Sequence, residues 1–189
     1  ADAAGVEDTA ATGRNGERGH LALVLSAGEV VEPVGTDREE GLAVLRNSAA
    51  HVLAQAVQPI NPKARLGIGP AIHDGFYYDF DVEDAFTPED LKALEKIMQR
   101  IINEGQTFVR RVVTDEAARE ELADEPYKCE LIGLQGGAVA SVEGADVEVG
   151  AGELTIYDHI RREGERAWGE LCRAPSVATA QAHGTRSRT

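Results

Sequence analysis

Residues 37–57 read DREEGLAVLRNSAAHVLAQAV, and their apolar side chains recur at spacings of three and four. This spacing is typical of an amphipathic helix that packs on one side. Asp37 stands where an N-cap or first turn is expected, and Pro59 ends the helix. Asn47 and His51 are four residues apart, so both lie on one face of this helix. The helix therefore carries two polar side chains beside its buried stripe.

A second polar pair with the same spacing lies near the other end of the sequence. Residues 172–176 read CRAPS and separate Cys172 from Ser176 by four positions. Between the two pairs, residues 67–80 read GIGPAIHDGFYYDF, in which glycines precede an aromatic run. The glycines permit a close backbone approach, and the aromatic run is typical of a strand. Imidazole and thiol groups exchange protons near neutral pH, so His51 and Cys172 are candidates for proton transfer.

The other segments alternate between helix and strand signals. Thr87 and Pro88 are typical of a helix start and Gly105 of its end, and another helix is expected after Thr114. Strands are expected over residues 20–25, 28–34, 66–70, 75–81, 108–113, 128–132, 138–142 and 146–149, while residues 157–160 and 168–172 complete the core. Clustered helices with antiparallel strands predict an α+β domain, an antiparallel sheet with packed helices.

Composition divides the sequence into four parts. Residues 1–19 are rich in small and acidic side chains with almost no large apolar residue, which predicts disorder. Residues 20–36 predict a short β-hairpin, and residues 37–178 are expected to form the α+β domain. Residues 179–189 are small, polar and basic, so a flexible basic tail is expected there.

Charge and cysteine content restrict the class of protein. The formal net charge of −14 argues against broad nonspecific binding of nucleic acid, which needs cations to neutralise phosphates, but leaves room for a local basic patch. No apolar run is long enough to cross a membrane, and no signal pattern opens the sequence, so a cytoplasmic protein is expected. Cys129 and Cys172 are too few for a disulfide framework, and Cys129 is expected to be a small buried apolar residue.

Five separated motifs occur in a fixed order along most of the sequence: LRNSAAH, LGIGPAIHDGFYYDF, FTPEDLKALEK, EPYK and WGELCRAP. Over roughly residues 41–178 this set resembles the editing domain of threonyl-tRNA synthetases, which alanyl-tRNA synthetases share. The resemblance implies that fold and an aminoacyl-tRNA partner, because in this family the domain opens the ester between an amino acid and the terminal adenosine of tRNA. No ATP motif or synthetase core follows the motifs, so a stand-alone homologue with altered motif residues is expected.

The resemblance also implies four catalytic positions. His51 and Cys172 fall on positions that line the reaction site in the family. Asn47 and Ser176 fall on two positions where the family usually has histidines. Asparagine keeps a hydrogen-bonding amide but removes a titratable base, and serine shortens the reach of the side chain. The four residues are therefore expected to form a reaction site with altered proton chemistry.

Five further residues are expected to bind substrate around that site. Lys128 matches a pocket lysine of the family, Tyr78 its aromatic run, and Glu170 a position that commonly holds Asp. His73 lies in the intervening turn segment and is a further candidate for proton transfer. Arg173 stands beside Cys172, where it could bind phosphate, lower the pKa of the thiol or form a surface ion pair.

A metal ion is not expected at this site. The alanyl-type relatives hold zinc with the same four positions, of which only His51 and Cys172 keep a good ligand here. Protein zinc sites normally need three or four such ligands. No metal and no other cofactor is therefore predicted.

Three functions fit the altered site. Loss of two histidines should impair activation of water, since removing a general base commonly costs about 10²–10⁴-fold in rate. We therefore expect an aminoacyltransferase that passes the amino acid from charged tRNA to a small-molecule amine or amide-type acceptor, as in a biosynthetic pathway. The ester is already activated, so this transfer needs no ATP. The alternatives are a deacylase that hydrolyses mischarged tRNA, and a noncatalytic binder of tRNA or of a synthetase.

Overall fold

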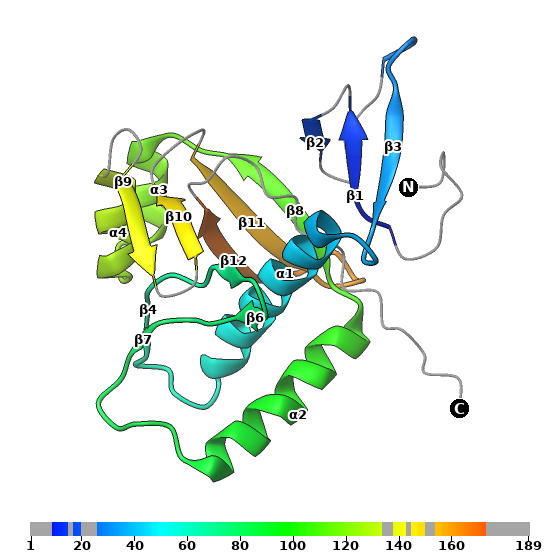
Figure 1. The fold of residues 1–189 in the computed structure, drawn as a ribbon. Coiled ribbons are helices and arrows are strands. Elements are labelled where there is room, and N and C mark those ends of the chain that lie inside the picture. Colours follow the sequence, from blue (N-terminus) through cyan, green and yellow to red (C-terminus); the bar gives the residue numbers. More distant parts are fainter. Residues whose placement is uncertain are drawn as a thin grey trace, which may run out of the picture.

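The computed structural model describes residues 9–14, 17–19, 26–133, 138–142, 145–149 and 154–172, with side chains over residues 26–132 and 154–169. Its centre is helix α1 (Glu39–Val57), which lies between a three-stranded antiparallel sheet and helix α2 (Pro88–Glu104) (Figure 1). The predicted α+β fold is confirmed.

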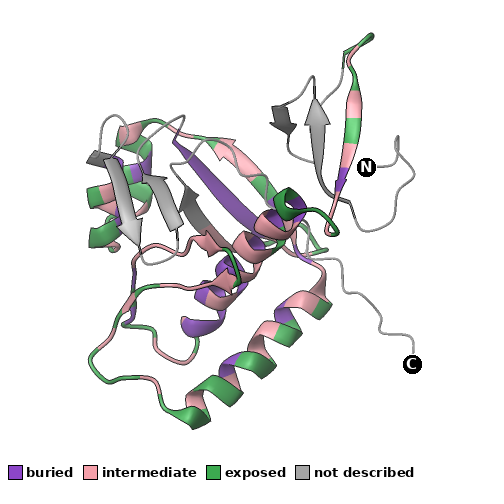
Figure 2. Ribbon diagram, viewed as in Figure 1, coloured by how far each residue is buried: buried purple, intermediate pink, exposed green. Residues whose placement is uncertain are grey.

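The central sheet has the strand order β12–β11–β8, with β8 (Thr107–Val112), β11 (Thr155–Ile160) and β12 (Arg166–Cys172). In this register His159 of β11 lies opposite Phe108 of β8 and Trp168 of β12. Every residue of β11 from Thr155 to His159 is buried, which Figure 2 shows as a purple strand. A strand buried on both faces is covered on both sides, here by two separate apolar clusters.

The two clusters lie on opposite faces of β11 because side chains alternate along a strand. Tyr157 packs with residues of α1 and α2, including Val52 and Leu94. Ile156 packs instead with Ala118 of helix α3 (Asp115–Glu121) and with Ile132 of helix α4 (Pro126–Gly133). The sheet is thus sandwiched between α1 with α2 on one face and α3 with α4 on the other.

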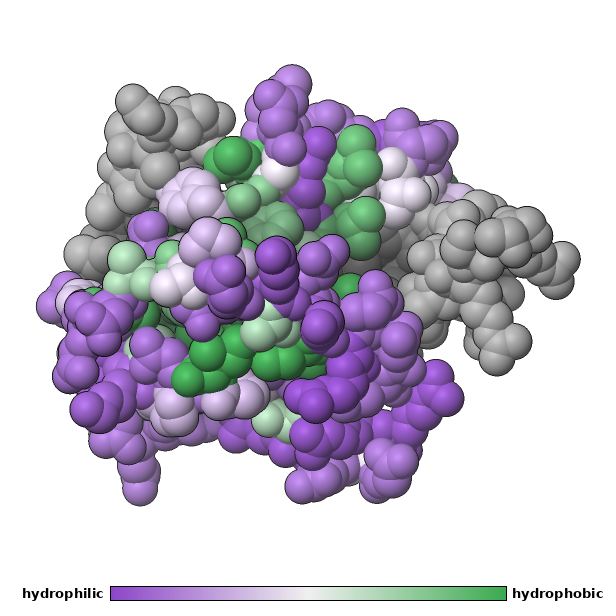
Figure 3. Space-filling view, turned by 90° about the horizontal axis from the view of Figure 1, so that it is seen from below, coloured by the Kyte–Doolittle hydropathy of each residue, from purple (hydrophilic) through white to green (hydrophobic). Residues whose placement is uncertain are grey.

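Helix α2 confirms the boundaries that its sequence predicts. Thr87 and Asp90 form a reciprocal capping box, with Thr87 N donating to the Asp90 carboxylate at 2.8 Å. Gly105 closes the helix in the left-handed region at φ 61°. Viewed from below in Figure 3, the molecule presents a mostly hydrophilic face with a hydrophobic area near its centre.

Helix α1 begins one residue later than its sequence predicts. The N-cap is Arg38, in an extended conformation and without a side-chain cap, so the prediction of Asp37 as N-cap is wrong. Asp37 lies one position too early to accept from the first free N–H groups. Glu39 and Glu40 occupy the first turn, where their charges complement the helix dipole.

Residues 128–132 form part of α4, so the strand predicted there is wrong. Pro126 stands at the start of this helix, where its missing N–H costs nothing, and Cys129 N donates to Glu125 O at 3.0 Å. Burial of Ile132 against α3 and β11 then favours the helix over the strand that local composition indicates.

The segment predicted as one strand over residues 75–81 contains two short strands instead. β6 (Gly75–Phe76) pairs with β5 (Ala71–Ile72), and β7 (Phe80–Asp81) pairs with β4 (Arg65–Leu66). Between them the chain turns so that Tyr78 lies against Gly69, where an added Cβ would stand 2.1 Å from the ring. The glycine therefore permits the close approach that the sequence predicts.

The N-terminal part differs from its prediction. Strands β1 (Thr9–Arg14) and β2 (Glu17–Gly19) lie within residues 1–19, where disorder is expected, because β3 (Val31–Gly35) supplies hydrogen-bond partners to β1. β3 thus pairs with β1, while its expected hairpin partner at residues 20–25 and the basic tail at residues 179–189 lie outside the described residues. β9 (Ala138–Val142) and β10 (Ala145–Val149) form the predicted pair. No described helix is long and apolar enough to cross a membrane.

Candidate functional site

His51 lies at the interface between α1 and the central sheet, with only 2% of its surface exposed. Helical spacing puts it on the same face as the buried side chains of Ser48 and Gln55. Its ring stacks on that of His159 at 5.6 Å and meets three other rings edge-on, those of Phe108, Tyr157 and Trp168, at 5.9 to 6.4 Å. The imidazole is thus held in one orientation by aromatic walls.

Hydrogen bonds connect this imidazole to two residues that sequence reasoning did not select. His159 Nδ1 lies 2.9 Å from Gln55 Oε1, and His159 Nε2 lies 3.4 Å from His51 Nδ1. Burial, and to a smaller extent the nearby positive charge of Lys128, lower the pKa of His51 to about 3. Burial also lowers the pKa of His159 to about 2, with His51 as the second cause. Both rings are therefore neutral at pH 7.

The buried Lys128 and the half-buried Tyr78 form a hydrogen-bonded pair close to His51. Lys128 lies on α4 with 3% of its surface exposed, and its Nζ donates to the Tyr78 hydroxyl at 3.1 Å. The ammonium also lies 5.5 Å from the centroid of the Tyr78 ring, which stacks on Phe80. A buried cation with a phenolic hydroxyl is an arrangement that stabilises negative charge developing on a substrate oxygen.

A cavity of about 220 Å³ opens onto this region. It is lined by Gln58, Leu66, Glu121, Leu122, Glu125, Lys128, Arg166, Trp168 and Gly169. Trp168, which lines the cavity, also packs edge-on against the His51 ring, whereas His51 is not among the lining residues. A small polar group could therefore reach Lys128 from solvent.

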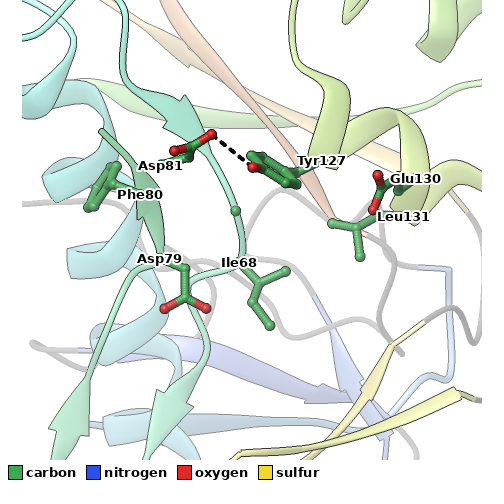
Figure 4. A pocket seen from close by; sticks show the side chains of 8 residues that line it. Ile68, Asp79, Phe80, Asp81, Tyr127, Glu130 and Leu131 are labelled. Carbon is green, nitrogen blue, oxygen red and sulfur yellow. Dashed lines mark hydrogen bonds between the residues drawn. The ribbon is translucent and has the colours of Figure 1, made fainter. Parts of the chain in front are cut away.

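A larger cavity of about 570 Å³ lies between β4, β7 and α4 (Figure 4). Ile68, Phe80 and Leu131 give it an apolar lining, and the carboxylates of Asp79, Asp81 and Glu130 stand around it. The Tyr127 hydroxyl donates to Asp81 at 2.8 Å, as the dashed line in Figure 4 shows. Such a lining suits a small molecule with an apolar body and a positive charge.

An ion network holds the sheet beneath the site. Asp158 on β11 is buried and pairs with Arg111 of β8 and with Arg166 of β12, the latter at 2.7 Å. Both guanidinium groups also contact Glu121 of α3. Hydrogen bonds to Asp158 raise the pKa of Arg111, the largest cause of that shift. The network ties all three strands to α3, so it fixes the register that places His159 against His51.

The structure brings several of the predicted site residues together. His51, Tyr78 and Lys128 form the buried cluster, and Asn47 lies one turn earlier on α1 in a half-buried position. His73 is not part of it: this side chain is 82% exposed at the turn between β5 and β6 and pairs with Asp74 at 2.7 Å. The prediction that His73 binds substrate therefore finds no support in its position.

The C-terminal motif is described only in part. Glu170 lies opposite Tyr157 and Cys172 opposite Thr155 in the register of β12 with β11. Their backbones thus run beside the strand that carries two of the ring contacts of His51. Arg173 and Ser176 lie outside the described residues.

Gln55, His159 and Trp168 are the site residues that sequence reasoning missed. Gln55 stands four positions after His51 on one helix face, which was a readable signal. His159 was read as part of the core because it lies in a strand of largely apolar neighbours, and only the tertiary structure shows its contact with α1. Among the residues with described placement, no group of three His, Cys, Asp or Glu could hold a metal ion.

Comparison with known proteins finds close relatives over most of the chain. No protein-family model matches it. The threonine–tRNA ligase of Thermobifida fusca is 61% identical over 169 residues, which is 89% of this chain and 26% of the ligase. Those of Streptomyces griseus and Streptomyces coelicolor are each 62% identical, over 87% of this chain and 25% of the ligase. The chain thus spans about a quarter of the length of these relatives.

Proposed function

On the premise that this chain is homologous to an editing-domain-like region of threonyl-tRNA synthetases, we propose that its buried site acts on the aminoacyl ester of a charged tRNA. One observation carries the proposal: the buried ammonium of Lys128, bonded to the Tyr78 hydroxyl, stands beside the neutral ring of His51. The similarity to threonine–tRNA ligases supports the class of substrate, and this cluster supports the chemistry.

Opening an ester requires a group that stabilises the oxygen of the attacked carbonyl. That oxygen becomes negative as the nucleophile adds, and donors in a water-poor site stabilise it far more than donors in water. The Lys128 ammonium carries a positive charge and donates to the Tyr78 hydroxyl at 3.1 Å. Lys128 with Tyr78 is therefore the pair that would bind the developing oxyanion.

The nucleophile that fits the site best is an amine. A histidine whose pKa lies near 3 is a weak base, so His51 draws a proton from water poorly. A neutral amine already presents a lone pair: its nitrogen bonds to the carbonyl carbon, the ester oxygen leaves with the tRNA, and one amine proton passes to that oxygen. The function proposed is thus transfer of the aminoacyl group to a small-molecule amine or amide-type acceptor.

The larger cavity supports this choice of acceptor. Amines are mostly protonated at pH 7, and the three carboxylates around that cavity attract cations while they repel phosphates. Tyr127 and Leu131 of α4, the helix that also carries Lys128, line this cavity. An amine would thus concentrate at this cavity as its cation, and it must release one proton to solvent before its nitrogen can attack the ester.

Hydrolysis is the second candidate, and the resemblance of the sequence motifs to editing domains supports it. Identity of about 60% to threonine–tRNA ligases extends over most of this chain. In that reading water takes the place of the amine in the same site, and the products are free amino acid and uncharged tRNA.

One experiment separates these functions. Purified protein is incubated with tRNAs carrying radiolabelled serine, threonine or another amino acid, with and without a panel of small primary amines. Label in an amide product only when amine is present supports transfer, whereas free amino acid without amine supports hydrolysis and contradicts transfer. Label that stays on tRNA in every case, with a gel shift of the tRNA, would contradict both and leave a binding role.

A further inference from the structure

The smaller cavity has a carboxylate in its wall that no described ion pair neutralises. Glu125 and Lys128 both line this cavity of about 220 Å³, and they stand one helical turn apart at the start of α4. Among the described residues, the Glu125 carboxylate makes one hydrogen bond, in which its Oε2 atom accepts from Leu66 N at 3.0 Å. Leu66 lines the cavity too, so the carboxylate lies in the wall between α4 and β4.

The second carboxylate of this cavity, that of Glu121, is already neutralised. It pairs with Arg166 at 2.6 Å and with Arg111 at 3.0 Å, and both guanidinium groups also pair with Asp158. These two acids and two bases balance one another's charges. Glu125 is therefore the carboxylate of this cavity that is available to a cationic ligand.

An aminoacyl ester matches the polarity of the cavity. Its α-nitrogen lies about 2.5 Å from the carbonyl carbon, because a single atom joins the two. The proposed function places the carbonyl oxygen at Lys128, so the α-ammonium falls in the same small cavity. With the oxygen toward Lys128 and the ammonium toward Glu125, each charge of the ligand meets an opposite charge, whereas the reversed orientation brings like charges together.

We propose that Glu125 binds the α-ammonium of the aminoacyl group in the smaller cavity and thereby orients the ester carbonyl toward Lys128. The identity of the ligand rests on the proposed function, whereas the affinity of the cavity for a small ammonium compound does not. The volume is below the roughly 300–1,000 Å³ of pockets for drug-sized ligands, so a small aminoacyl group fits best. The larger cavity is then left for the acceptor.

Binding of serinamide to the full chain tests this assignment without any reaction. Serinamide carries an α-ammonium beside a carbonyl oxygen, and glyceramide differs from it only by a hydroxyl in place of the ammonium. Trp168 is the single tryptophan of the chain and lines the cavity, so its fluorescence reports occupancy. At about pH 6, where an α-amine is protonated, serinamide should bind about tenfold to hundredfold more tightly than glyceramide, as expected of a hydrogen bond between charged groups.

A variant separates recognition of charge from a structural role. Glu125→Gln keeps an oxygen that can accept from Leu66 N but removes the negative charge, so the preference for serinamide should disappear. Glu120→Gln, at an exposed position of α3, is the matched control and should keep the full preference. A purely structural role of Glu125 would weaken binding of both amides equally, which would overturn the proposal. A protein whose fluorescence responds to neither amide would overturn it as well.

Turnover provides a second readout. The kcat/KM on tRNA charged with serine, relative to that on tRNA esterified with glyceric acid, should fall about tenfold to hundredfold in Glu125→Gln and stay unchanged in Glu120→Gln. Loss of this preference in Glu170→Gln instead, with Glu125→Gln unchanged, would overturn the proposal.

The two readouts also fail separately. Binding of serinamide that depends on Glu125, in a protein inactive on every charged tRNA, would confirm the ammonium site and contradict the proposed function. Turnover that keeps its full preference for the ammonium in Glu125→Gln would overturn the role of Glu125 while the proposed function stands.

Discussion

Lys128 Nζ donates to the hydroxyl of Tyr78 at 3.1 Å, although the two residues are fifty positions apart in the sequence. The contact joins α4 to the turn between β6 and β7, and both residues are at least partly buried. Because a buried ammonium needs hydrogen-bond acceptors, this contact helps to hold the Lys128 side chain in place. The chemistry proposed for the site depends on that relationship.

Tyr78→Phe should lower ester turnover about tenfold, because the Lys128 ammonium loses a partner and the substrate loses a donor. Tyr77→Phe is the matched control: the Tyr77 hydroxyl is buried without a hydrogen-bond partner among the described residues. Removing it should leave turnover unchanged and stabilise the fold by about 1 kcal/mol. Turnover on charged tRNA and urea unfolding measure both effects, and equal turnover in the two variants would refute the role of Tyr78.

Gly69→Ala should disturb the same contact from the other side. A Cβ at Gly69 would stand 2.1 Å from the Tyr78 ring, which must then shift away from Lys128. We expect a loss of turnover together with about 1–3 kcal/mol of unfolding free energy. Gly75→Ala meets no atom within 4 Å and should leave turnover unchanged. A fully active Gly69→Ala protein would show that the position of Tyr78 is not critical.

The two buried histidines should make the folded protein less stable as the pH decreases. Their folded pKa values, about 3 for His51 and about 2 for His159, lie below the ordinary value near 6.5. As pH falls below about 6.5, the unfolded chain binds protons that the folded chain excludes, so their contribution is complete above this pH and is lost toward pH 3. The slope is up to about 1.4 kcal/mol per pH unit for each histidine.

Urea unfolding at several pH values between 7.5 and 4.5 measures this slope. His159→Phe keeps an aromatic ring but removes the buried titrating group, so its slope should be smaller than that of the unchanged protein. His73→Gln, at an exposed turn, should retain the full slope. Identical slopes in all three proteins would mean that the buried pair does not control acid stability.

Asn47→His should increase hydrolysis relative to transfer. Asn47 lies one turn before His51 on α1, at a position where the editing domains that the sequence resembles usually have histidine. A titratable base there should raise release of free amino acid by about tenfold to hundredfold. Asn103→His on the exposed side of α2 is the control. No increase in Asn47→His would show that loss of this histidine is not what limits hydrolysis.

Local signals made much of the fold predictable from sequence. Thr87 and Gly105 bound α2 as their residue types predict, because caps depend on neighbours within one turn. The local sequence predicted a strand at Lys128. The helix found there depends on burial of Ile132 against distant elements, which the local sequence does not show. The strand around Thr9, where disorder was expected, likewise depends on a distant segment, because β3 supplies its hydrogen-bond partners.

The site was predictable only where the family resemblance supplied its residues. His51, Tyr78 and Lys128 were selected by that resemblance, and no periodicity would have joined residues fifty positions apart. His159 was missed because a histidine inside a buried strand has the same sequence pattern as a core residue. Its role follows from a contact across 108 positions, which only the folded chain shows.

The most direct measurement is the single-turnover rate of ester loss from charged tRNA in the presence of amine, compared between the unchanged protein and Lys128→Met. Lys96→Met, on the exposed face of α2, is the matched control. We predict that Lys128→Met lowers the rate about 10²–10³-fold while tRNA affinity stays within a few fold, and that Lys96→Met changes neither. An unchanged rate in a folded Lys128→Met protein would contradict the claim that this buried site acts on the ester.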